Sequence, residues 1–161
     1  METQGERIIP IRREHDERLA EVIRAALKEN GLDIPGTAYF DSALDSLSEF
    51  YSLPGREYHV LMTDGAPAGG IELAEFYGLP ECCELQKLYL DRSARGRGAG
   101  YRLIRHIEER ALSLGYKRIY LETHSLLKAA IHEYERMGFK EIPRPEAVVH
   151  STMDRFYLKE L

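Results

Sequence analysis

Apolar side chains recur at helical spacing in four segments of the chain. In residues 16–29 they occupy positions i, i+3, i+4, i+7 and i+8, which predicts an amphipathic helix that ends at Asn30-Gly31. The members of this first stripe are Leu19, Val22, Ile23, Ala26 and Leu27. Similar spacing predicts further helices from Asp41 to the Pro54-Gly55 break, over 101–114 and over about 126–137.

Shorter segments, several of which alternate apolar with polar or small residues, read as strands. They cover residues 7–11, 58–62, 68–76, 84–90, 118–123, 139–142 and 153–158. Asp64-Gly65 predicts a hairpin turn between the second and third of these strands. The order β-α-α-β-β-β-α-β-α-β-β predicts an α/β (α+β) fold in a single domain over residues 1–161.

Length and composition exclude several classes of protein. A chain of 161 residues with 43% hydrophobic content can bury one real core. No apolar run reaches the roughly 18 residues that span a bilayer, and Met1–Arg7 contains no apolar signal region, so we predict a cytoplasmic protein without a membrane partner. The formal charge of −5 argues against a nucleic-acid partner, which usually requires a basic face.

The charge is unevenly distributed along the chain. Residues 1–80 carry 7 basic and 15 acidic side chains, whereas residues 81–161 carry 15 basic and 12 acidic ones. The stretch 87–118 alone holds 9 basic and 3 acidic residues. This asymmetry predicts different partners for the two halves of the chain, with an anionic ligand for the basic stretch.

Two adjacent cysteines, Cys82 and Cys83, show no spacing typical of a zinc site. Neighbouring cysteines rarely form a disulfide with each other, because the geometry is strained. We predict a pair of reduced, partly buried thiols, with redox sensing as the alternative, and no metal site.

The segment Arg95-Gly96-Arg97-Gly98-Ala99-Gly100 lies between a predicted strand and a predicted helix. Glycines let backbone N–H groups approach a ligand, and a helix start adds unpaired donors and the positive end of the helix dipole. The segment therefore predicts a phosphate or pyrophosphate site, with a tight glycine turn as the alternative. It lacks the Gly-Lys pair of a P-loop and does not complete the GxGxxG pattern of dinucleotide-binding folds.

Arg95-x-x-Gly98-x-Gly100 matches the [Q/R]xxGx[G/A] signature of the GNAT family of N-acetyltransferases, which this chain resembles. Glu84-Leu-Gln-Lys-Leu-Tyr-Leu resembles the family's fourth strand, and Tyr120-Leu-Glu-Thr with Tyr134-Glu-Arg-Met-Gly-Phe139 resembles its fifth strand and the helix after it. The resemblance implies a GNAT-like domain, with a twisted, mixed, mostly antiparallel sheet flanked by helices. A finer resemblance, through Cys83-Glu-Leu-Gln-Lys-Leu-Tyr, Leu121-Glu-Thr and the residues from His150 to Tyr157, is to acetyltransferase domains fused behind MarR-type regulators.

The family resemblance also implies a reaction, in which acetyl-CoA donates an acetyl group directly to an amine and no metal takes part. The fourth and fifth strands would separate, and pantetheine would lie between them, bonded by the backbone of Leu88, Tyr89 and Leu90. Backbone amides of the glycine-rich loop would hold the pyrophosphate; the loop residues are Arg95, Gly96, Arg97, Gly98, Ala99, Gly100 and Tyr101. The acceptor would be a small cationic amine or an amino acid, and the protein a monomer or homodimer.

Two side chains match catalytic positions of the family. Glu84 lies where some members place a general base acting through a water, although an ordinary strand carboxylate is the alternative. Strict alternation would place Glu84, Gln86, Leu88 and Leu90 on one face, unless a β-bulge intervenes. Tyr134 matches the usual general acid, with a core tyrosine as the alternative.

The acceptor side is predicted in less detail. In the family, the first two helices and their connection form much of it, and here that region carries Tyr39 and Tyr51 among acidic residues. Such a mixture suits a cationic amine, although a solvated acidic face is the alternative. His124 and His150 are further candidate acceptor contacts. Leu127 departs from the pattern, because many members carry there an Asn that bonds the cofactor.

Two other functions remain open at this point. A protein acetyltransferase acting on lysine or an N-terminal amine would present an open groove, whereas an enzyme for small molecules would have a closed pocket. An acyl-CoA sensor without catalytic activity would have no need of Glu84 and Tyr134.

Overall fold

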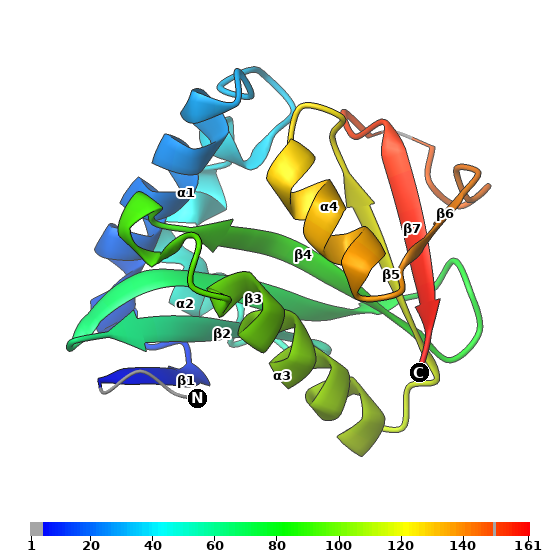
Figure 1. Cartoon of the computed structure of the whole chain (residues 1–161), viewed down its shortest axis with the longest axis horizontal. Coiled ribbons are helices and arrows are strands. Elements are labelled where there is room, and N and C mark those ends of the chain that lie inside the picture. Colours follow the sequence, from blue (N-terminus) through cyan, green and yellow to red (C-terminus); the bar gives the residue numbers. More distant parts are fainter. Residues whose placement is uncertain (1–4, 150) are drawn as a thin grey trace.

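A seven-stranded sheet, covered on each face by two helices, forms the centre of the molecule (Figure 1). The computed structural model describes residues 5–149 and 151–161. The strands are β1 (Glu6–Pro10), β2 (Arg56–Thr63), β3 (Ala66–Phe76), β4 (Cys82–Leu90), β5 (Arg118–Thr123), β6 (Lys140–Ile142) and β7 (Arg155–Glu160). The α-helices are α1 (Asp16–Glu29), α2 (Leu47–Phe50), α3 (Ala99–Ser113) and α4 (Lys128–Arg136). This order confirms the predicted fold class.

The strands lie in the order β1-β2-β3-β4-β5-β7-β6, and every neighbouring pair is antiparallel except β4 and β5. That parallel pair is short: it joins Cys82–Glu84 of β4 to Arg118–Tyr120 of β5 and then ends. Beyond Glu84 and Tyr120 the two strands diverge, while β5 stays paired with β7 over its whole length. The sheet therefore opens between β4 and β5, as the family resemblance implies.

Each face of the sheet has its own hydrophobic core. On one face, the buried stripe of α3 packs with Ile131 and Tyr134 of α4 against the sheet; this stripe consists of Leu103, Ile104, Ile107 and Ala111. On the other face, α1 and α2 pack against Tyr58, Val60 and Met62 of β2. The predicted apolar stripes of α1 and α3 are thus the surfaces that these helices bury.

A β-bulge in β4 decides which side chains reach each face. The register between β3 and β4 passes from Gly70↔Tyr89 to Glu72↔Gln86, so β4 contains one extra residue. Lys87 in this bulge has a positive φ of 48°. The bulge reverses the alternation, so Leu88 and Leu90 pack on the α3 face, opposite to Glu84. The bulge that the sequence left open is therefore present, and Glu84 and Gln86 do not share a face with Leu88 and Leu90.

The second predicted helix is also wrong in part. The chain forms 3₁₀ turns over Ala38–Phe40 and Ser42–Ser46, and α2 itself has only four residues. Aspartate and serine side chains compete with helical hydrogen bonding in this segment. Asp41 accepts a hydrogen bond from the Ala43 N–H at 2.9 Å, and Ser48 donates to Asp16 of α1. The expected apolar contacts survive, because Leu44, Leu47 and Tyr51 are all buried.

Cys82 and Cys83 are both free and buried. Burial raises the pKa of Cys82 to about 11 and that of Cys83 to about 12. Thiols in this state react slowly, which favours the predicted structural role over redox sensing. None of the helices within residues 5–149 and 151–161 is long and apolar enough to cross a membrane.

We predict opposite effects of the same substitution at two glycines. A Cβ at Gly70 would lie 2.4 Å from Tyr58 Cε1 and 2.7 Å from the His59 carbonyl, so Gly70→Ala should lower the free energy of unfolding by about 2 kcal/mol. A Cβ at Gly100 would meet nothing closer than 3.9 Å, and alanine is the better helix former, so Gly100→Ala should raise it by up to about 1 kcal/mol. Urea denaturation followed by circular dichroism measures both, and equal effects would contradict the packing of β2 on β3.

Candidate active site

The glycine-rich loop leads directly into α3. Gly96 and Gly98 have positive φ values of 76° and 77°, which turn the backbone into the left-handed region that glycine adopts most easily. Gly98 is the N-cap of α3, so the N–H groups of Ala99, Gly100 and Tyr101 belong to the first turn and have no partner within the helix. This arrangement fits an anion such as a pyrophosphate.

Arginines fix the loop on both sides. Arg95 donates to the Leu90 carbonyl through Nε and Nη2, at 3.2 and 3.0 Å, and its Nη1 lies 2.6 Å from Glu29 of α1. Arg102 donates to the Arg97 carbonyl at 2.8 Å. Arg95 and Arg102 therefore hold the shape of the loop, while the exposed Arg97 remains the side chain that is best placed to meet an anion.

Carboxylates from the first half of the chain pair with the basic stretch 87–118. Lys87 contacts Glu72, Arg92 and Arg95 contact Glu29, Arg102 contacts Glu6, and Arg110 contacts Glu57. The charge asymmetry of the sequence therefore serves in large part to join the two halves of the chain. Most of these cations are therefore paired within the protein. The groups of the basic stretch that we still expect to meet an anionic ligand are the loop backbone and Arg97.

Glu84 lies at the last parallel pair before β4 and β5 diverge. It is 9% exposed, and this burial raises its pKa to about 7, helped by Glu122 and Glu72 and opposed by Gln86 and Lys87. A carboxyl group that titrates near neutral pH is suited to accept a proton from an amine.

Lys87 lies in a buried polar cluster next to Glu84. Its Nζ lies 3.2 Å from Glu72 and 3.0 Å from the Tyr51 hydroxyl, which itself donates a short hydrogen bond to Glu72. The ammonium also lies over the rings of Phe50 and Tyr51. The Lys87 ammonium thus balances the charge of Glu72 beside Glu84.

Tyr134 of α4 approaches the opening from the other face of the sheet. Its side chain is 5% exposed and packs edge to face on Phe139. Burial raises the pKa of Tyr134, and the neighbouring Tyr89 of β4 adds to this shift. The phenol therefore stays protonated at neutral pH and keeps an O–H group to donate.

A pocket of about 500 Å³ lies on the Glu84 side of the sheet. Its walls come from the α1–α2 connection, from β4 and β5, and from the segment before β7. The lining residues are Gly36, Thr37, Ala38, Phe40, Asp41, Gln86, Lys87, Tyr89, Glu122, Ser151, Thr152 and Met153. Glu122 and Lys87 both interact electrostatically with Glu84, so the pocket lies next to the carboxyl group that titrates near neutral pH.

Two loops meet across this pocket. Thr152 donates a hydrogen bond to the Gly36 carbonyl at 3.1 Å, and a Cβ at Gly36 would lie 2.5 Å from the Thr152 methyl carbon. Ser151 donates to Glu122 at 2.9 Å, and Asp154 accepts hydrogen bonds from the Ser125 backbone and hydroxyl. The contact between Thr152 and Gly36 closes one side of the pocket. Hydrogen bonds at Ser151 and Asp154 hold the segment that carries Thr152.

Comparison with known proteins agrees with this geometry. The sequence model of the acetyltransferase (GNAT) family matches residues 19–139. The chain belongs to this family. It is 40% identical over 126 residues to the uncharacterized N-acetyltransferase YjgM of Escherichia coli (strain K12), covering 77% of this chain and 75% of that protein. An uncharacterized N-acetyltransferase of Schizosaccharomyces pombe is 28% identical over 119 residues, covering 74% and 72%.

Solved structures of the GNAT family share the fold over nearly the whole chain. A GNAT acetyltransferase from Staphylococcus aureus Mu50 superposes with a TM-score of 0.82 at 22% identity, covering 96% of this chain and 98% of that one. The PaiA N-acetyltransferase of Thermoplasma acidophilum, solved in complex with coenzyme A, gives a TM-score of 0.77 at 21% identity, covering 98% and 100%. The family model and the two curated relatives show that the protein is an N-acetyltransferase of the GNAT type, and the solved structures show that it shares the fold.

The predicted acceptor residues of this GNAT enzyme lie in different places. Within the described part of the chain, the pocket lining includes Phe40 rather than its neighbour Tyr39, and Tyr51 lies deeper, bonded to Glu72. The Nδ1 atom of His124 accepts a hydrogen bond from the Leu126 N–H at 3.1 Å. His150 lies outside the described residues.

The residues predicted to contact the donor lie together on β4 and in the loop after it, but their side chains point to both faces of the sheet. Leu88 and Leu90 face α3, and Tyr89 faces the α1 side, so the strand presents its backbone edge toward the opening. The Leu90 carbonyl is engaged by Arg95. Leu127 is the N-cap of α4 and packs against the α1 core, so it supplies no polar group in place of the usual Asn.

Sequence reasoning missed Glu122 and Gln86, which line the pocket beside Glu84. Glu122 follows Tyr120 by two residues on β5, so the two side chains share a face, and the Tyr120 hydroxyl donates to Glu122 at 3.0 Å. That alternation is the sequence signal that could have found Glu122. The position of Gln86 depends on the bulge, which composition alone does not reveal.

We predict that Glu84→Gln changes how stability depends on pH. The folded pKa of about 7 exceeds the ordinary value of 4.5. Between these two values the Glu84 carboxyl group loses its proton in the unfolded chain but keeps it in the folded protein. The free energy of unfolding therefore falls as the pH rises from about 4.5 to about 7. Between pH 4.5 and pH 8, the variant should therefore gain about 3 kcal/mol relative to the unsubstituted protein. Urea titrations at several pH values measure this difference.

The matched control is Glu49→Gln, because Glu49 is exposed on α2. It should follow the stability of the unsubstituted protein across the whole pH range. A flat difference for Glu84→Gln as well would mean that the Glu84 carboxyl group titrates at its ordinary pKa.

Proposed function

We propose that the protein transfers an acetyl group from acetyl-CoA directly to the primary amine of a small cationic molecule or amino acid. The observation that carries this proposal is the position of Glu84. A buried carboxyl group with a pKa raised to about 7 lies where β4 and β5 diverge, next to a pocket lined by Glu122 and Asp41. A carboxyl group in that place can deprotonate an amine beside the donor.

The donor side fits acetyl-CoA in charge and in backbone geometry. The first turn of α3 and the two left-handed glycines offer N–H groups to the pyrophosphate, and the opening between β4 and β5 accommodates pantetheine. Among similar folds, the PaiA enzyme was solved with coenzyme A, and a Salmonella typhimurium structure named yncA was solved with acetyl-CoA. Acetyl-CoA supplies an acyl group that is already activated as a thioester.

Glu84 would serve as the general base. An amine is protonated in neutral solution and must lose a proton before it can attack a carbonyl group. Glu84 does not line the pocket itself, so the proton would pass through a water held near Gln86 and Glu122. This route agrees with the water-mediated role that the family resemblance implies.

Tyr134 would assist the departure of the thiolate. Its O–H group is buried and stays protonated, because burial raises its pKa. A hydrogen bond from the phenol to sulfur would stabilise the negative charge that develops as the C–S bond breaks. The position of Tyr134 on the face opposite to Glu84 places the two groups on either side of the strand opening.

The pocket favours a small acceptor over a protein side chain. The contact between Thr152 and Gly36 narrows access, and Glu122 and Asp41 provide carboxylates for a positively charged group. Protein acetylation is the second candidate, since Phe40 stands 62% exposed at the rim, where a peptide could lie. A purely acyl-CoA-sensing role would leave the shifted pKa of Glu84 without a function.

The same proposal includes the expected location, the oligomeric state and the partners of the enzyme. A cytoplasmic location would give access to acetyl-CoA, and the enzyme would act as a monomer or homodimer without a nucleic-acid or membrane partner. The resemblance to domains fused behind MarR-type regulators rests on His150 and Asp154 as well as β4, and it adds nothing about the acceptor.

We predict distinct kinetic changes for the two catalytic side chains. Glu84→Gln should lower kcat/KM for the amine by about 100-fold near pH 7.5, and the difference should shrink near pH 10, where the amine loses its proton without help. Tyr134→Phe should lower kcat by about 100-fold at all of these pH values, while the Kd for CoA stays the same. A thiol-release assay across an amine panel measures these rates.

The outcomes separate the candidate functions. Unchanged kinetics in both variants would remove Glu84 and Tyr134 from the mechanism. Binding of acetyl-CoA without turnover on any small amine or peptide would favour the sensor, whereas turnover on lysine peptides alone would favour protein acetylation.

We also predict that the acceptor needs the charge of Glu122. Glu122→Gln retains one acceptor oxygen for Ser151 or Tyr120, and its NH2 group can donate to the other hydroxyl, but the substitution removes the negative charge. The KM for a cationic amine should rise about tenfold, with little change in the KM for acetyl-CoA. A preference of the unsubstituted enzyme for anionic acceptors would contradict the acidic pocket as the recognition element.

A further inference from the structure

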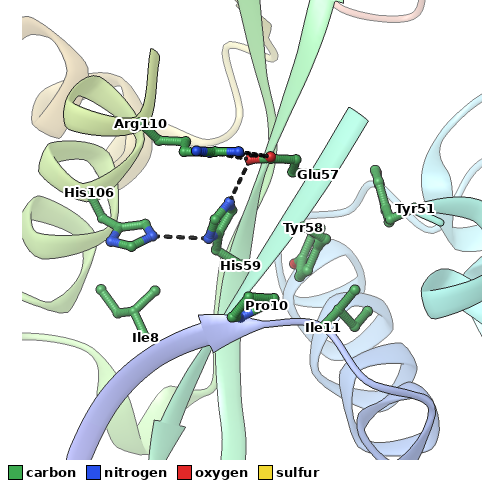
Figure 2. Close-up of a pocket in the computed structure, with 9 residues that line it drawn as sticks. All are labelled: Ile8, Pro10, Ile11, Tyr51, Glu57, Tyr58, His59, His106 and Arg110. Carbon is green, nitrogen blue, oxygen red and sulfur yellow. Dashed lines mark hydrogen bonds and ion pairs between the residues drawn. The ribbon is translucent and has the colours of Figure 1, made fainter. Parts of the chain in front are cut away.

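A chain of polar contacts joins β2 to the middle of α3, on the face of the sheet opposite to the proposed acceptor pocket. Figure 2 shows it at the edge of a second pocket of about 410 Å³, with Glu57 and His59 on the strand and His106 and Arg110 on the helix. His106 Nε2 lies 2.9 Å from His59 Nδ1, and His59 Nε2 lies 3.0 Å from Glu57. Arg110 binds both carboxylate oxygens of Glu57 at 2.6 to 3.2 Å.

The direction of each hydrogen bond follows from the chemistry of the partners. Glu57 is ionised, because Arg110 and His59 lower its pKa to about 2, so it can only accept. His59 must then carry a proton on Nε2, and in its neutral form its Nδ1 is an acceptor. His106 must therefore donate through Nε2. This arrangement leaves one proton between the two facing ring nitrogens, with no room for a second.

Few negative charges near His59 and His106 could stabilise an added proton on either ring. Glu57 is already paired with Arg110, and Glu109 on α3 is the other carboxylate that acts on His106. Burial and His59 lower the pKa of His106. From the neighbouring strands come uncharged groups: Ile8 and Pro10 of β1, and Ile71 of β3, which pairs with His59. The remaining titratable groups of the pocket are the phenols of Tyr51 and Tyr58.

The same side of α3 reaches the anion-binding loop. Arg102, His106 and Arg110 are spaced four residues apart, so they form one stripe along the helix. Arg102 donates to the Arg97 carbonyl inside the loop and also to both carboxylate oxygens of Glu6 on β1, at 2.8 Å. We name these three helix residues with Glu6, Glu57 and His59 the α3 seam. The α3 seam therefore holds the loop and the helix in one position on β1 and β2.

We propose that His106, through its contact with His59, is a positioning residue for donor binding, and that acid weakens binding of CoA by opening the α3 seam. A proton on His106 Nδ1 adds a third positive charge to a stripe that already carries Arg102 and Arg110. A further proton on His59 Nδ1 sets two N–H groups against each other and breaks the contact. The helix then loses a link to β2 one turn from the residue that shapes the loop.

The direction of the pH effect follows from comparing histidine in the folded protein with histidine in the unfolded chain. Histidine normally titrates near pH 6.5, and burial beside His59 disfavours the charged form of His106, so the α3 seam is complete above that pH and weakens as the pH falls below it. The inference rests on the proposed use of CoA, and its test is binding rather than turnover, so that protonation of Glu84 does not enter.

Isothermal titration of CoA at pH 7.5 and pH 5.5 tests the proposal, with the full chain as its unsubstituted form and as His106→Gln. The Gln amide can still donate to His59 but does not titrate in this range. CoA phosphate itself gains a proton near pH 6, so the comparison between variants decides the outcome. The unsubstituted protein should lose at least threefold more affinity on acidification than His106→Gln, and His132→Gln, an exposed histidine on α4, should behave like the unsubstituted protein.

Equal losses in all three proteins would overturn the proposal, and so would a loss in His132→Gln that matched His106→Gln. If His106→Gln does not fold, the imidazole ¹⁵N signals of the unsubstituted protein decide. They should show both rings protonated on Nε2 at pH 7.5, and the His106 titration should coincide with the loss of CoA affinity; titration without that loss overturns the proposal. If CoA fails to bind at either pH, the proposed function fails first.

Discussion

The extra residue in β4 is the constraint on which the rest of the site depends. Without it, β4 would keep one alternation from Cys82 to Leu90, and Leu88 would share the face of Glu84. With it, the strand places acidic and polar groups on the α1 side before the bulge and apolar groups on the α3 side after it. The bulge follows the last residue of β4 that pairs with β5, so the opening for the donor and the change of face occur together.

Holding a lysine in the bulge carries a cost that its neighbours offset. A non-glycine residue with φ of 48° is strained by roughly 1 to 3 kcal/mol. The Lys87 carbonyl accepts a hydrogen bond from Tyr58 at 3.1 Å, and its ammonium binds Glu72 and Tyr51. The same contacts place one positive charge among three carboxyl groups, which limits the repulsion that Glu72 and Glu122 exert on Glu84. One side chain thus supports the backbone conformation of the bulge and opposes part of the rise in the pKa of Glu84, whose main cause is burial.

The sequence was enough to predict the order of the elements, the stripes of α1 and α3, and the glycine-rich turn that leads into α3. These features depend on local periodicity and on glycines whose conformation is local; the ends of most elements differ from the predicted ones by no more than two residues. The weak points involved contacts between distant segments. Tyr39 and Phe40 are adjacent aromatic residues, and only the turn over Ala38–Phe40 decides which of the two rings lines the pocket. Glu122 was missed because its role depends on Ser151 and Glu84, which lie far from it in the chain.

The ion pairs change the meaning of the charge asymmetry that the sequence displays. Glu6, Glu29, Glu57 and Glu72 come from the acidic half, and each binds a cation that lies on or next to the elements around the donor loop. An exposed pair of this kind adds little to stability, but two of them, Arg102 with Glu6 and Arg110 with Glu57, join α3 to β1 and β2. The pairs of Glu29 join the loop before α3 to α1. Because the N-terminal turn of α3 is a backbone site, its affinity for an anion depends on the orientation of α3 more than on any single arginine. The acidic half of the chain therefore contributes to the proposed site for an anion, by holding the first turn of α3 in place.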